Sequence, residues 1–360
     1  MEKPKKITAK DVAELAGVST ATVSIVLNGK GNGRFPEQTC QKILDACKKL
    51  GYKKGGIFKA SEVNDKVLIA IVPSYTNYYY VETVEAMQRR AKELGYSLLT
   101  FDTFQDMEQE TRILQICTQL QVAGIVFLYP LENEILMQQM DWKMPSVHIY
   151  DKDIYYDIDI LERDSRRVGQ ALGSFLIKLG HKRIAFITSS MRTKQLCRIR
   201  RLEGIRDVYK KNGYNPDECV IACSPDTETF NSRVIPDGYD LGYILTKRLL
   251  DRGEDFTAVI AVNDVIAVGV MDAITESGYR IPEDYSVCAC DNINLARFRG
   301  ISLTAADSYS AQSGKTAIEM LVKKIEEGDE VPVEDGPSEI SRVEYFPKIV
   351  ERGSTGPRKK

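Results

Sequence analysis

The sequence predicts an α/β protein with a small helical module at its N-terminus, and three observations lead to this fold class. From Val67 onward, short β-branched runs alternate with longer amphipathic stretches, as in parallel sheets covered by helices. The alternation occurs in two comparable series, which predicts two lobes. The first fifty residues show only the helical spacing of apolar residues. A chain of 360 residues has room for one small and one large domain.

Charge is distributed unevenly along the chain. The first sixty residues carry eleven Lys and one Arg against five acidic residues, a net charge of +7. The remainder carries 37 basic and 46 acidic residues, a net charge of −9. A basic module on an acidic body indicates a nucleic-acid partner for the module. From charge alone, a lysine-rich solvated surface is the alternative.

The composition indicates a cytoplasmic protein. No eighteen apolar residues follow one another, and the start lacks an apolar export segment, so neither membrane insertion nor secretion is expected. The eight cysteines are scattered without a CxxC pair, and the chain has two histidines. This usage is typical of a reduced compartment and predicts no metal site and no cofactor.

Local signals divide the first fifty residues into three helices. Thr8 begins the capping box of a first helix, and Gly17 can supply the positive φ that ends it. Ser19 can then cap a second helix after a tight turn, and Pro36 suits the first turn of a third. The result is a three-helix helix-turn-helix headpiece, expected over residues 1–51.

The second of these helices is the predicted recognition helix. In a helix-turn-helix it enters the major groove, and its outer face here is short, polar and uncharged, so it can approach the bases closely. The predicted DNA-binding residues are Thr8, Ser19, Thr20, Ala21, Thr22, Ser24 and Asn28, with Lys53 and Lys54 in the segment that follows. The alternative is that the Ser and Thr residues only cap and solvate a three-helix bundle.

Eight runs in the remaining chain are predicted strands. They are VLIAIV (67–72), SLLTF (97–101), GIVFL (124–128), SVHIY (146–150), RIAFIT (183–188), CVIAC (219–223), AVIAV (258–262) and SVCAC (286–290). Helical patterns such as VETVEAMQRRAKELG (81–95) and YDLGYILTKRLLDRG (239–253) lie between them.

Polar and aromatic residues follow several of these strands. Ligands of open parallel sheets bind outside the carboxyl ends of the strands, so the interface between two such lobes is the expected pocket. The residues at these ends include Ser74 to Tyr80, Asp151, Ser189, Asn263 and Asp291. Aromatic faces beside carboxylates and amides suit a hydroxylated ligand such as a sugar. Alternatively, Asp and Asn after a strand cap the next helix.

The segment ITAKDVAELAGVSTATVSIVLNG closely resembles the DNA-binding headpiece of the lactose-repressor (LacI-type) family, with its signature D-V-A-x-x-A-G-V-S-x-x-T-V-S. LGHKRIAFIT, RLEGIRDVY and TAVIAVNDVIAVGVMDAITESGYRIPEDYSV resemble later parts of the same family. The resemblance implies a helix-turn-helix headpiece joined to a two-lobed periplasmic-binding-protein-like domain with parallel sheets. It also implies an effector bound between the lobes, by Tyr79, Tyr80, Asp151, Arg201, Phe230, Asn263 and Asp291. Ser74, at the end of the first strand, is added to this set as a strand-end residue.

The sequence departs from the family pattern near the headpiece. Ile25 stands where relatives commonly have arginine, and the loop from Gly29 to Phe35 is longer than usual. The linker, expected over residues 52–65, reads YKKGGIFKAS where the family has a hinge helix with a leucine wedge. Its two glycines disfavour a helix, so the hinge is degenerate.

The family's fold sets the expected lobe boundaries. The effector-binding and dimerisation domain covers residues 66–350. Its first lobe is expected at about 66–164 and 308–336, and its second at about 165–307 and 337–350, including the final strand VEYFPKIV. Residues 351–360 are expected to form a flexible tail. Because the tail has no leucine heptad, a homodimer on a pseudo-palindromic operator is favoured over a tetramer.

These observations predict a sequence-specific DNA-binding repressor controlled by a small molecule, a sugar or sugar derivative. One alternative is a global carbon-source regulator that uses a protein co-regulator. Another is a metabolite-binding protein without specific operator binding. An enzyme is not expected, because GKGNG (29–33) follows a helix rather than a strand, and SGKT (313–316) lacks the earlier glycine of a phosphate loop.

Overall fold

The computed structural model describes residues 7–27, 34–50, 52, 66–120, 122–131, 144–152, 159–191, 196–225, 238–327 and 340–359. The chain divides into two compact units, Met1–Asp65 and Lys66–Lys360, which are described separately. Within the described ranges, no helix combines the length and the apolar character needed to cross a membrane.

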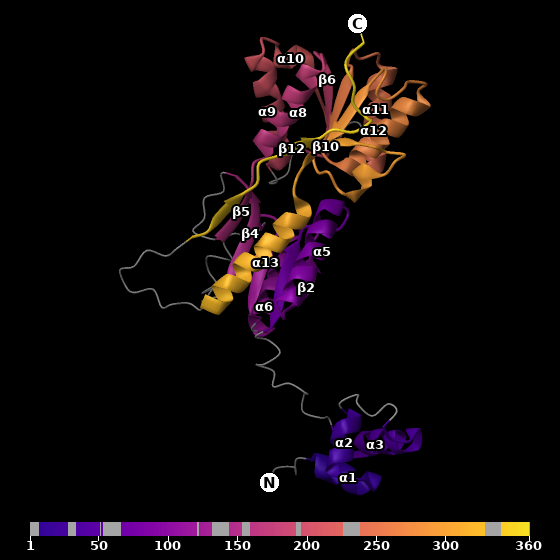
Figure 1. The fold of residues 1–360 in the computed structure, drawn as a ribbon, viewed down its shortest axis with the longest axis vertical. Helices are drawn as coiled ribbons and strands as arrows, with labels where there is room; N and C mark the ends of the chain where they lie inside the picture. Colours follow the sequence, from indigo (N-terminus) through magenta and orange to yellow (C-terminus); the bar gives the residue numbers. More distant parts are fainter. Residues whose placement is uncertain are drawn as a thin grey trace, which may run out of the picture. The chain divides into compact units, whose positions relative to one another are not determined.

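The first unit contains three helices, α1 (Ala9–Ala16), α2 (Thr20–Leu27) and α3 (Glu37–Leu50) (Figure 1). The side chains of Val12, Val23 and Ile43, one from each helix, are completely buried against one another. The helix boundaries follow the local signals, since α1 ends at Gly17 with φ of 67°. Three short helices around so few buried residues form a core that depends on each of them.

The second unit contains two six-stranded sheets. The first sheet has the strand order β11-β5-β4-β3-β1-β2 and is parallel throughout. Its strands are β1 (Val67–Val72), β2 (Ser97–Asp102), β3 (Gly124–Phe127), β4 (Ser146–Asp151), β5 (Asp159–Arg163) and β11 (Arg342–Glu344). Helices α5 (Tyr78–Glu93) and α13 (Ser310–Glu327) cover one face, and α6 (Met107–Leu120) covers the other.

The second sheet has the strand order β12-β10-β9-β8-β6-β7, with only β12 antiparallel. Its strands are β6 (Ile184–Ile187), β7 (Val220–Cys223), β8 (Ala258–Ala261), β9 (Ser286–Ala289), β10 (Thr304–Asp307) and β12 (Lys348–Val350). Its helices are α8 (Ser165–Lys178), α9 (Cys197–Lys211), α10 (Pro216–Cys219), α11 (Gly238–Asp251), α12 (Asp264–Glu276) and the 3₁₀ helix η1 (Asn294–Arg297). Figure 1 shows α8 and α9 on one face of this sheet and α11 and α12 on the other.

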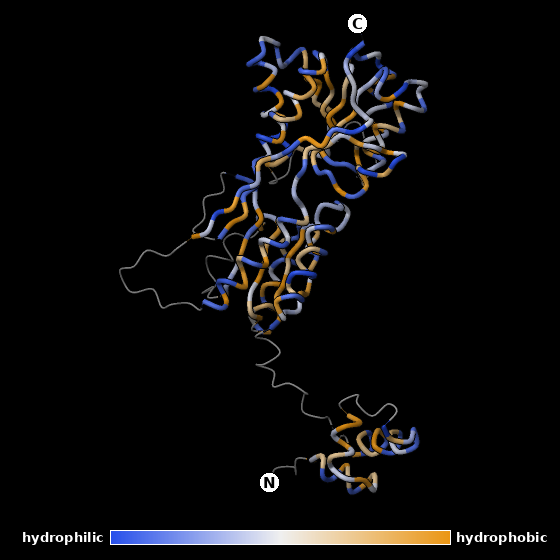
Figure 2. Tube along the Cα trace, in the orientation of Figure 1, coloured by the Kyte–Doolittle hydropathy of each residue, from blue (hydrophilic) through white to orange (hydrophobic). Residues whose placement is uncertain are grey.

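The apolar strands explain why both sheets are central. The central strands of each sheet are among the most apolar stretches of the chain (Figure 2), and they are buried along their whole length. Helices cover both faces, so a continuous apolar run rather than an alternating one is required. The predicted α/β fold class with parallel sheets is therefore confirmed.

Helices pack in pairs through glycines. A Cβ added at Gly169 of α8 would lie 2.0 Å from the carbonyl oxygen of Arg201 in α9. A Cβ at Gly204 of α9 would lie 1.9 Å from the carbonyl oxygen of Arg166 in α8. The pairs α11–α12 and α5–α13 approach each other at glycines in the same way. Only glycine permits backbones to come this close.

All eight strand predictions coincide with observed strands, whereas β5 and β10 were not predicted. Both lack the long β-branched run that marks the others: β5 reads DILER and β10 reads TAAD. Their pairing with β4 and β9 supplies the strand geometry that their own sequences do not specify.

The lobe boundaries near the C-terminus need two corrections. Residues 342–344, expected in the second lobe, form β11 beside β5 in the first sheet. The predicted strand VEYFPKIV is thus two strands, because Pro347 has no backbone N–H to donate to a ladder. Only β12 joins the second sheet.

Residues 351–359 were expected to be flexible, and this prediction is wrong. Ser354 and Thr355 are buried, and the Ser354 N–H donates to the Ser302 carbonyl at 3.0 Å. The Val287 N–H in turn donates to the Ser354 carbonyl at 2.8 Å, and the Arg358 N–H donates to the Leu179 carbonyl at 2.8 Å. Backbone and hydroxyl hydrogen bonds, which no hydrophobic pattern reveals, hold this segment on the second lobe.

Candidate functional site

Capping interactions position the recognition helix in the headpiece. The carboxylate of Asp11 accepts hydrogen bonds from the backbone N–H of Thr8 at 2.6 Å and from its hydroxyl at 2.7 Å. The Ser19 hydroxyl accepts from the N–H of Thr22 at 3.0 Å and lies 2.8 Å from the Thr22 hydroxyl. Three of the predicted DNA-binding residues, Thr8, Ser19 and Thr22, therefore also stabilise the starts of α1 and α2.

The outer face of α2 is open to solvent. Thr20, Ala21 and Ser24 are exposed, while Val23 is buried in the headpiece core. At spacings of one and four residues the three exposed side chains share one side of the helix. The predicted contacts Asn28, Lys53 and Lys54 lie outside the described residues.

Most of the excess positive charge of the first sixty residues belongs to segments outside the described residues. The described headpiece residues include Lys10, Arg34, Lys42, Lys48 and Lys49, against four acidic residues. The remaining lysines of the first sixty residues fall in 1–6, 28–33 and 53–59. A neutral outer face on α2 within a basic N-terminal segment matches base contact by the helix and phosphate contact by basic side chains.

A cavity of about 350 Å³ lies between the two lobes of the second unit. Residues that follow β1 and β2, with the last residue of β5, form the first-lobe wall. Residues of α9 and those that follow β6, β8 and β9 form most of the second-lobe wall. The cavity is thus outside the carboxyl ends of parallel strands, as the sequence predicts. Of the predicted effector-binding residues it is lined by Ser74, Tyr79, Tyr80, Arg201, Asn263 and Asp291.

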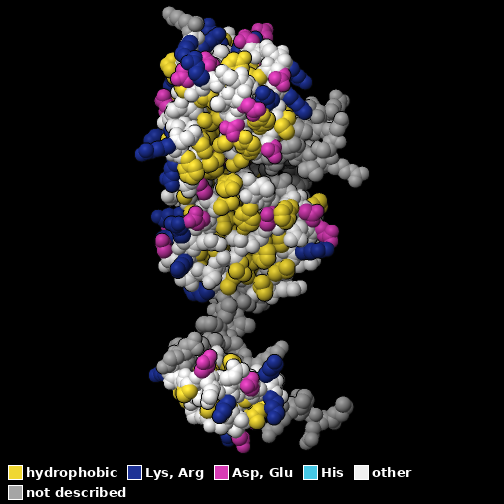
Figure 3. All heavy atoms as spheres, turned by 90° about the vertical axis from the view of Figure 1, so that its right-hand side faces the viewer, with side chains coloured by type: hydrophobic (Ala, Val, Ile, Leu, Met, Phe, Trp, Pro, Cys, Tyr) yellow, Lys and Arg dark blue, Asp and Glu magenta, His cyan; other side chains and the backbone are white. Residues whose placement is uncertain are grey.

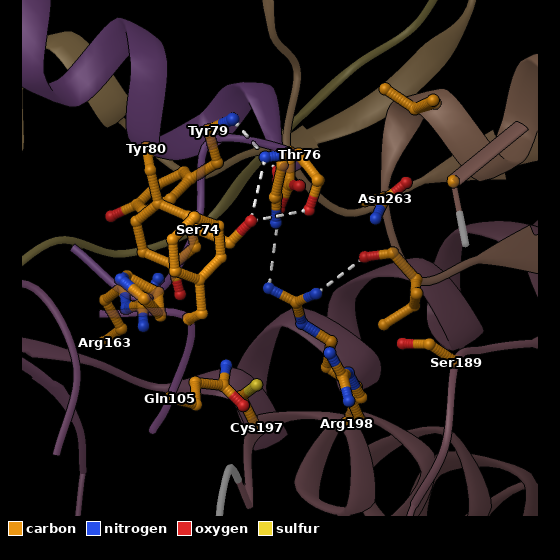
Figure 4. A pocket seen from close by; sticks show the side chains of 18 residues that line it. Ser74, Thr76, Tyr79, Tyr80, Gln105, Arg163, Ser189, Cys197, Arg198 and Asn263 are labelled. Carbon is orange, nitrogen blue, oxygen red and sulfur yellow. Dashed lines mark hydrogen bonds and ion pairs between the residues drawn. The ribbon is translucent and has the colours of Figure 1, made fainter. Parts of the chain in front are cut away.

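Two tyrosines dominate the first-lobe wall (Figure 4). The Asn77 side chain caps α5 by accepting from the N–H of Tyr79 at 3.0 Å, which places Tyr79 and Tyr80 in the first turn of the helix. Their rings meet edge to face, with centroids 5.3 Å apart. Burial raises the pKa of Tyr80 to about 12, so its hydroxyl keeps its proton at neutral pH and can donate a hydrogen bond. Aromatic surface with a polar end suits stacking on a sugar ring.

Arg201 forms the centre of the second-lobe wall. It projects from α9 and donates to the Val262 carbonyl at 2.7 Å, and it pairs with Asp291 at 3.5 Å. The Asp264 carboxylate lies fully buried behind Asp291 and accepts N–H groups of the chain from Asp291 to Ile293, the shortest at 2.7 Å. Desolvation and the charge of Asp291 raise the pKa of Asp264. This network fixes the strand end that carries Asp291.

Asn263 both caps the helix that follows it and lines the cavity. Its side-chain oxygen accepts the N–H of Ile266 at 2.8 Å and so caps α12. The residue also lines the cavity. Because the cap uses only the amide oxygen, the NH₂ group keeps two donors for a ligand.

Asp151 does not lie on the cavity wall. Its Oδ1 accepts the N–H of Ser165 at 3.0 Å and of Lys152 at 3.1 Å, at the point where the chain crosses from β5 into α8. Asp151 therefore helps to hold this crossing. Its Oδ2 is buried without a hydrogen-bond partner among the described residues, and its contact with the effector stays a prediction. Phe230, the remaining predicted residue, lies outside the described residues.

Several cavity residues were not predicted, and Arg163, Arg198 and Gln105 are the most polar of them. Arg163 was missed because β5, whose last residue it is, was not recognised as a strand. Arg198 precedes Arg201 by three residues on α9, so helical spacing could have placed both on one face. Gln105 follows β2, with φ of 59°. Ser189 was identified as a strand-end residue and does line the cavity.

Comparisons with known proteins match both units. The family described as "Bacterial regulatory proteins, lacI family" matches residues 8–54, and the family described as "Periplasmic binding protein-like domain" matches residues 174–355. The ribose operon repressor of Escherichia coli K12 is 31% identical over 361 residues, covering 96% of this chain and 99% of that protein. The HTH-type transcriptional repressor PurR of Mannheimia succiniciproducens is 29% identical over 351 residues, covering 96% and 98%.

Solved structures show the same fold. A LacI-family transcriptional regulator from Silicibacter pomeroyi superposes with a TM-score of 0.71 at 24% identity, covering 98% of this chain and 100% of the other. The lac repressor dimer bound to operator and the anti-inducer ONPF superposes with a TM-score of 0.68 at 24% identity and the same coverage. The resemblance predicted from the headpiece motif is confirmed, as is the prediction of a regulator rather than an enzyme. The chain belongs to the lacI family of bacterial regulatory proteins.

Proposed function

We propose that this chain is a transcriptional repressor whose affinity for an operator is set by a small hydroxylated effector in the interlobe cavity. The observation that carries the proposal is the pairing of a capped helix-turn-helix with a separate two-lobed unit whose polar cavity lies at the strand ends of both lobes. A ligand that binds the open and closed arrangements of the lobes unequally shifts the equilibrium between them by that difference in free energy.

The effector we infer is a sugar or sugar derivative. Tyrosine faces line one side of the cavity, while the other presents a carboxylate, an amide and a guanidinium within reach of hydroxyl groups. A hydroxyl left unpaired in such a site would be costly, so the arrangement selects for polyhydroxylated ligands. The ribose operon repressor and PurR, as named, come from sugar and purine regulation, and the first of these has the higher identity.

The functional unit we infer is a homodimer on a pseudo-palindromic operator in the cytoplasm, where the DNA lies. Figure 3 shows apolar side chains on one face of both lobes, and exposed apolar residues occur at the edge strand β2 and on α6. These are Leu99, Phe104, Met107, Ile116 and Leu120. Exposed apolar side chains that gather on one face are typical of subunit interfaces. Sedimentation equilibrium of the purified chain measures the assembly directly.

The test combines selection of bound DNA from a random duplex library with fluorescence anisotropy on the selected sequence. We expect an inverted repeat and a change in its affinity when one compound of a sugar and nucleobase panel is added. Binding without sequence preference at any salt concentration would contradict operator recognition. A selected repeat whose affinity no small molecule changes would point instead to a protein co-regulator.

Thr20→Asp tests the recognition helix. Thr20 is the first residue of α2, where an acidic side chain stabilises a helix, so the variant is expected to fold. Its carboxylate would face bases and phosphates, and we expect the operator affinity to fall at least about 100-fold, since a buried like-charge contact costs several kcal/mol. Lys48→Gln on α3 changes the net charge equally and serves as the control. Equal losses in the two variants would contradict the assignment of α2.

A further inference from the structure

The charged groups on the cavity wall are predominantly positive. Among the residues that line it, Arg163, Arg198 and Arg201 are cationic, and Asp291 is the acid. Arginine remains protonated in proteins under all ordinary conditions. A neutral sugar needs donors and acceptors but no excess of cations, so this imbalance calls for an explanation.

Asp291, the acid on the cavity wall, is paired with Arg201. Arg201 forms this ion pair at 3.5 Å and donates a further hydrogen bond to the Val262 carbonyl at 2.7 Å. Both residues are nearly buried. The charges of Arg201 and Asp291 therefore compensate each other, and the excess belongs to the other two arginines.

Arg163 lies at the end of β5 with its guanidinium over the ring of Tyr79, 5.0 Å from the ring centroid. Its Nε is buried and has no hydrogen-bond partner among the described residues. The Tyr79 hydroxyl, on a side chain only 2% exposed, is also buried without a partner in that part of the chain. The aromatic contact orients the guanidinium but satisfies none of its N–H donors.

Asp151 and Asp264 lie behind the wall. Asp151 acts on Arg163 electrostatically; its Oδ1 accepts two backbone N–H groups, while its Oδ2 is buried without a hydrogen-bond partner among the described residues. The Asp264 carboxylate accepts three. Neither forms an ion pair with Arg163 or Arg198 in the ranges that the structure describes. Backbone donors thus take up much of the hydrogen-bonding capacity of these carboxylates.

Arg198 approaches the cavity from the other lobe. It projects from α9, and one of its amino groups donates to the Ser190 carbonyl at 3.0 Å. Figure 4 shows Arg163 beside the tyrosine rings and Arg198 on the side of α9. The two unpaired cations therefore come from different lobes and line the same cavity.

We propose that the effector is anionic, a polyhydroxylated small molecule with a carboxylate or phosphate group that Arg163 and Arg198 bind between the lobes. This inference rests on the proposed function and specifies the ligand of the same cavity. A guanidinium fork matches the geometry of either group. Both arginines are half-buried, and an anion supplies the counter-ion that neither has in an ion pair among the described residues. Because each lobe supplies one arginine, the anion favours the closed arrangement. A neutral sugar would leave buried donors unpaired.

The experiment measures binding to the full-length chain by isothermal titration calorimetry and by thermal shift. The probes are matched pairs: galacturonate with galactose, gluconate with glucose, and glucose 6-phosphate with glucose, with inorganic phosphate alone as a further arm. The carboxylate and phosphate arms distinguish the two sources of charge. A bacterial metabolite extract, split by anion exchange into retained and unretained fractions, covers ligands outside the pairs. Operator affinity is measured in parallel with every probe.

We expect an anionic probe or the retained fraction to stabilise the chain, with at least tenfold tighter binding than the neutral partner. Arg163→Met and Arg198→Gln should each reduce this preference at least tenfold, and Arg163→Lys should restore part of it. Arg299→Met, an exposed position outside the cavity, removes the same charge and should leave the preference unchanged. Thermal melts of the variants show whether they fold.

The outcomes separate this inference from the proposed function. A neutral sugar, or the unretained fraction, that binds and changes operator affinity would overturn the inference while the proposed function stands. Anion preference that survives both substitutions would overturn the role of the two arginines. If nothing binds and operator affinity never changes, regulation by a small effector has failed, and the inference fails with it.

Discussion

Gly169→Ala is expected to disturb the second-lobe wall of the cavity through the packing of α8 on α9. The new Cβ would lie 2.0 Å from the Arg201 carbonyl oxygen, whereas ordinary contacts begin at 3.4 Å. The two helices must therefore separate by about 1.4 Å, because a methyl group cannot rotate away from a backbone atom. Overpacking costs up to about 3 kcal/mol, and the better helix propensity of alanine returns about 1 kcal/mol. The net loss is about 2 kcal/mol.

The displaced residue is Arg201 itself, so binding should suffer as well as stability. A shift of this size would break the 2.7 Å hydrogen bond to the Val262 carbonyl and lengthen the 3.5 Å pair with Asp291. We expect effector affinity to fall at least about tenfold, equivalent to 1.4 kcal/mol. Operator binding without effector should persist, because the headpiece is a separate unit.

The assay is urea unfolding followed by circular dichroism, together with calorimetric titration of the effector. Gly300→Ala is the control, because a Cβ at Gly300 meets no atom within 4 Å and its φ is not in the left-handed region. That variant should stay within about 0.5 kcal/mol of the parent. If the two variants unfold at the same urea concentration and bind effector equally, the close helix contact is not as rigid as this reasoning requires.

Two further predictions concern the headpiece and the first lobe. Ile43→Ala should destabilise the headpiece by about 2–5 kcal/mol, because its core has few other buried residues, and should abolish operator binding. Calorimetry should show the main transition of the larger unit unchanged. Leu44→Ala, at a residue 49% exposed on the same helix, is the control, and operator binding retained by Ile43→Ala would contradict the prediction. Burial lowers the pKa of His148 from 6.5 to about 3 in the folded state, so the unfolded chain binds more protons between these values and the free energy of unfolding falls as the pH drops below about 6.5. The His148 ring stacks on Phe127, so the substitution His148→Phe keeps an aromatic ring at this position. It should flatten the pH dependence when the melting temperatures of the two proteins are compared from pH 4 to 8. Parallel curves for variant and parent would show that His148 is not the group responsible.

Local signals were sufficient for much of the fold. Caps at Thr8 and Ser19 and the turn at Gly17 depend on neighbours within four residues, so the headpiece helices could be predicted one at a time. Most of the eight apolar runs that became strands are buried on both faces, and a continuous apolar run predicts such a strand directly. The exceptions are the edge strands β2 and β7, which are partly exposed. The strands β5 and β10 contain no such apolar run, because their geometry comes from the neighbouring strands with which they pair.

Part of the site followed from the sequence in the same way. Tyr79, Asn263 and Asp291 follow predicted strands, and residues that follow parallel strands meet at one edge of the sheet. Asp151 obeys the same rule but turns to the backbone of Ser165 instead. A residue at a strand end can cap the next helix, line the cavity or, like Asn263, do both, and the position of the next helix decides which.

The sequence alone determined the local structure of the chain and its class of protein. It specified the three capped helices, the apolar runs that form two parallel sheets, and the basic headpiece that binds DNA. What only the tertiary structure decided is which distant side chains share a cavity. Arg163 and Arg198 come from different lobes, and neither stands in a motif that connects it to the other. The fixed C-terminal segment was equally hidden, because Ser354 is held by hydrogen bonds to residues about fifty and seventy positions away. Sequence patterns indicate contacts between residues that are near neighbours in the chain, whereas contacts between distant residues form only when the chain has folded.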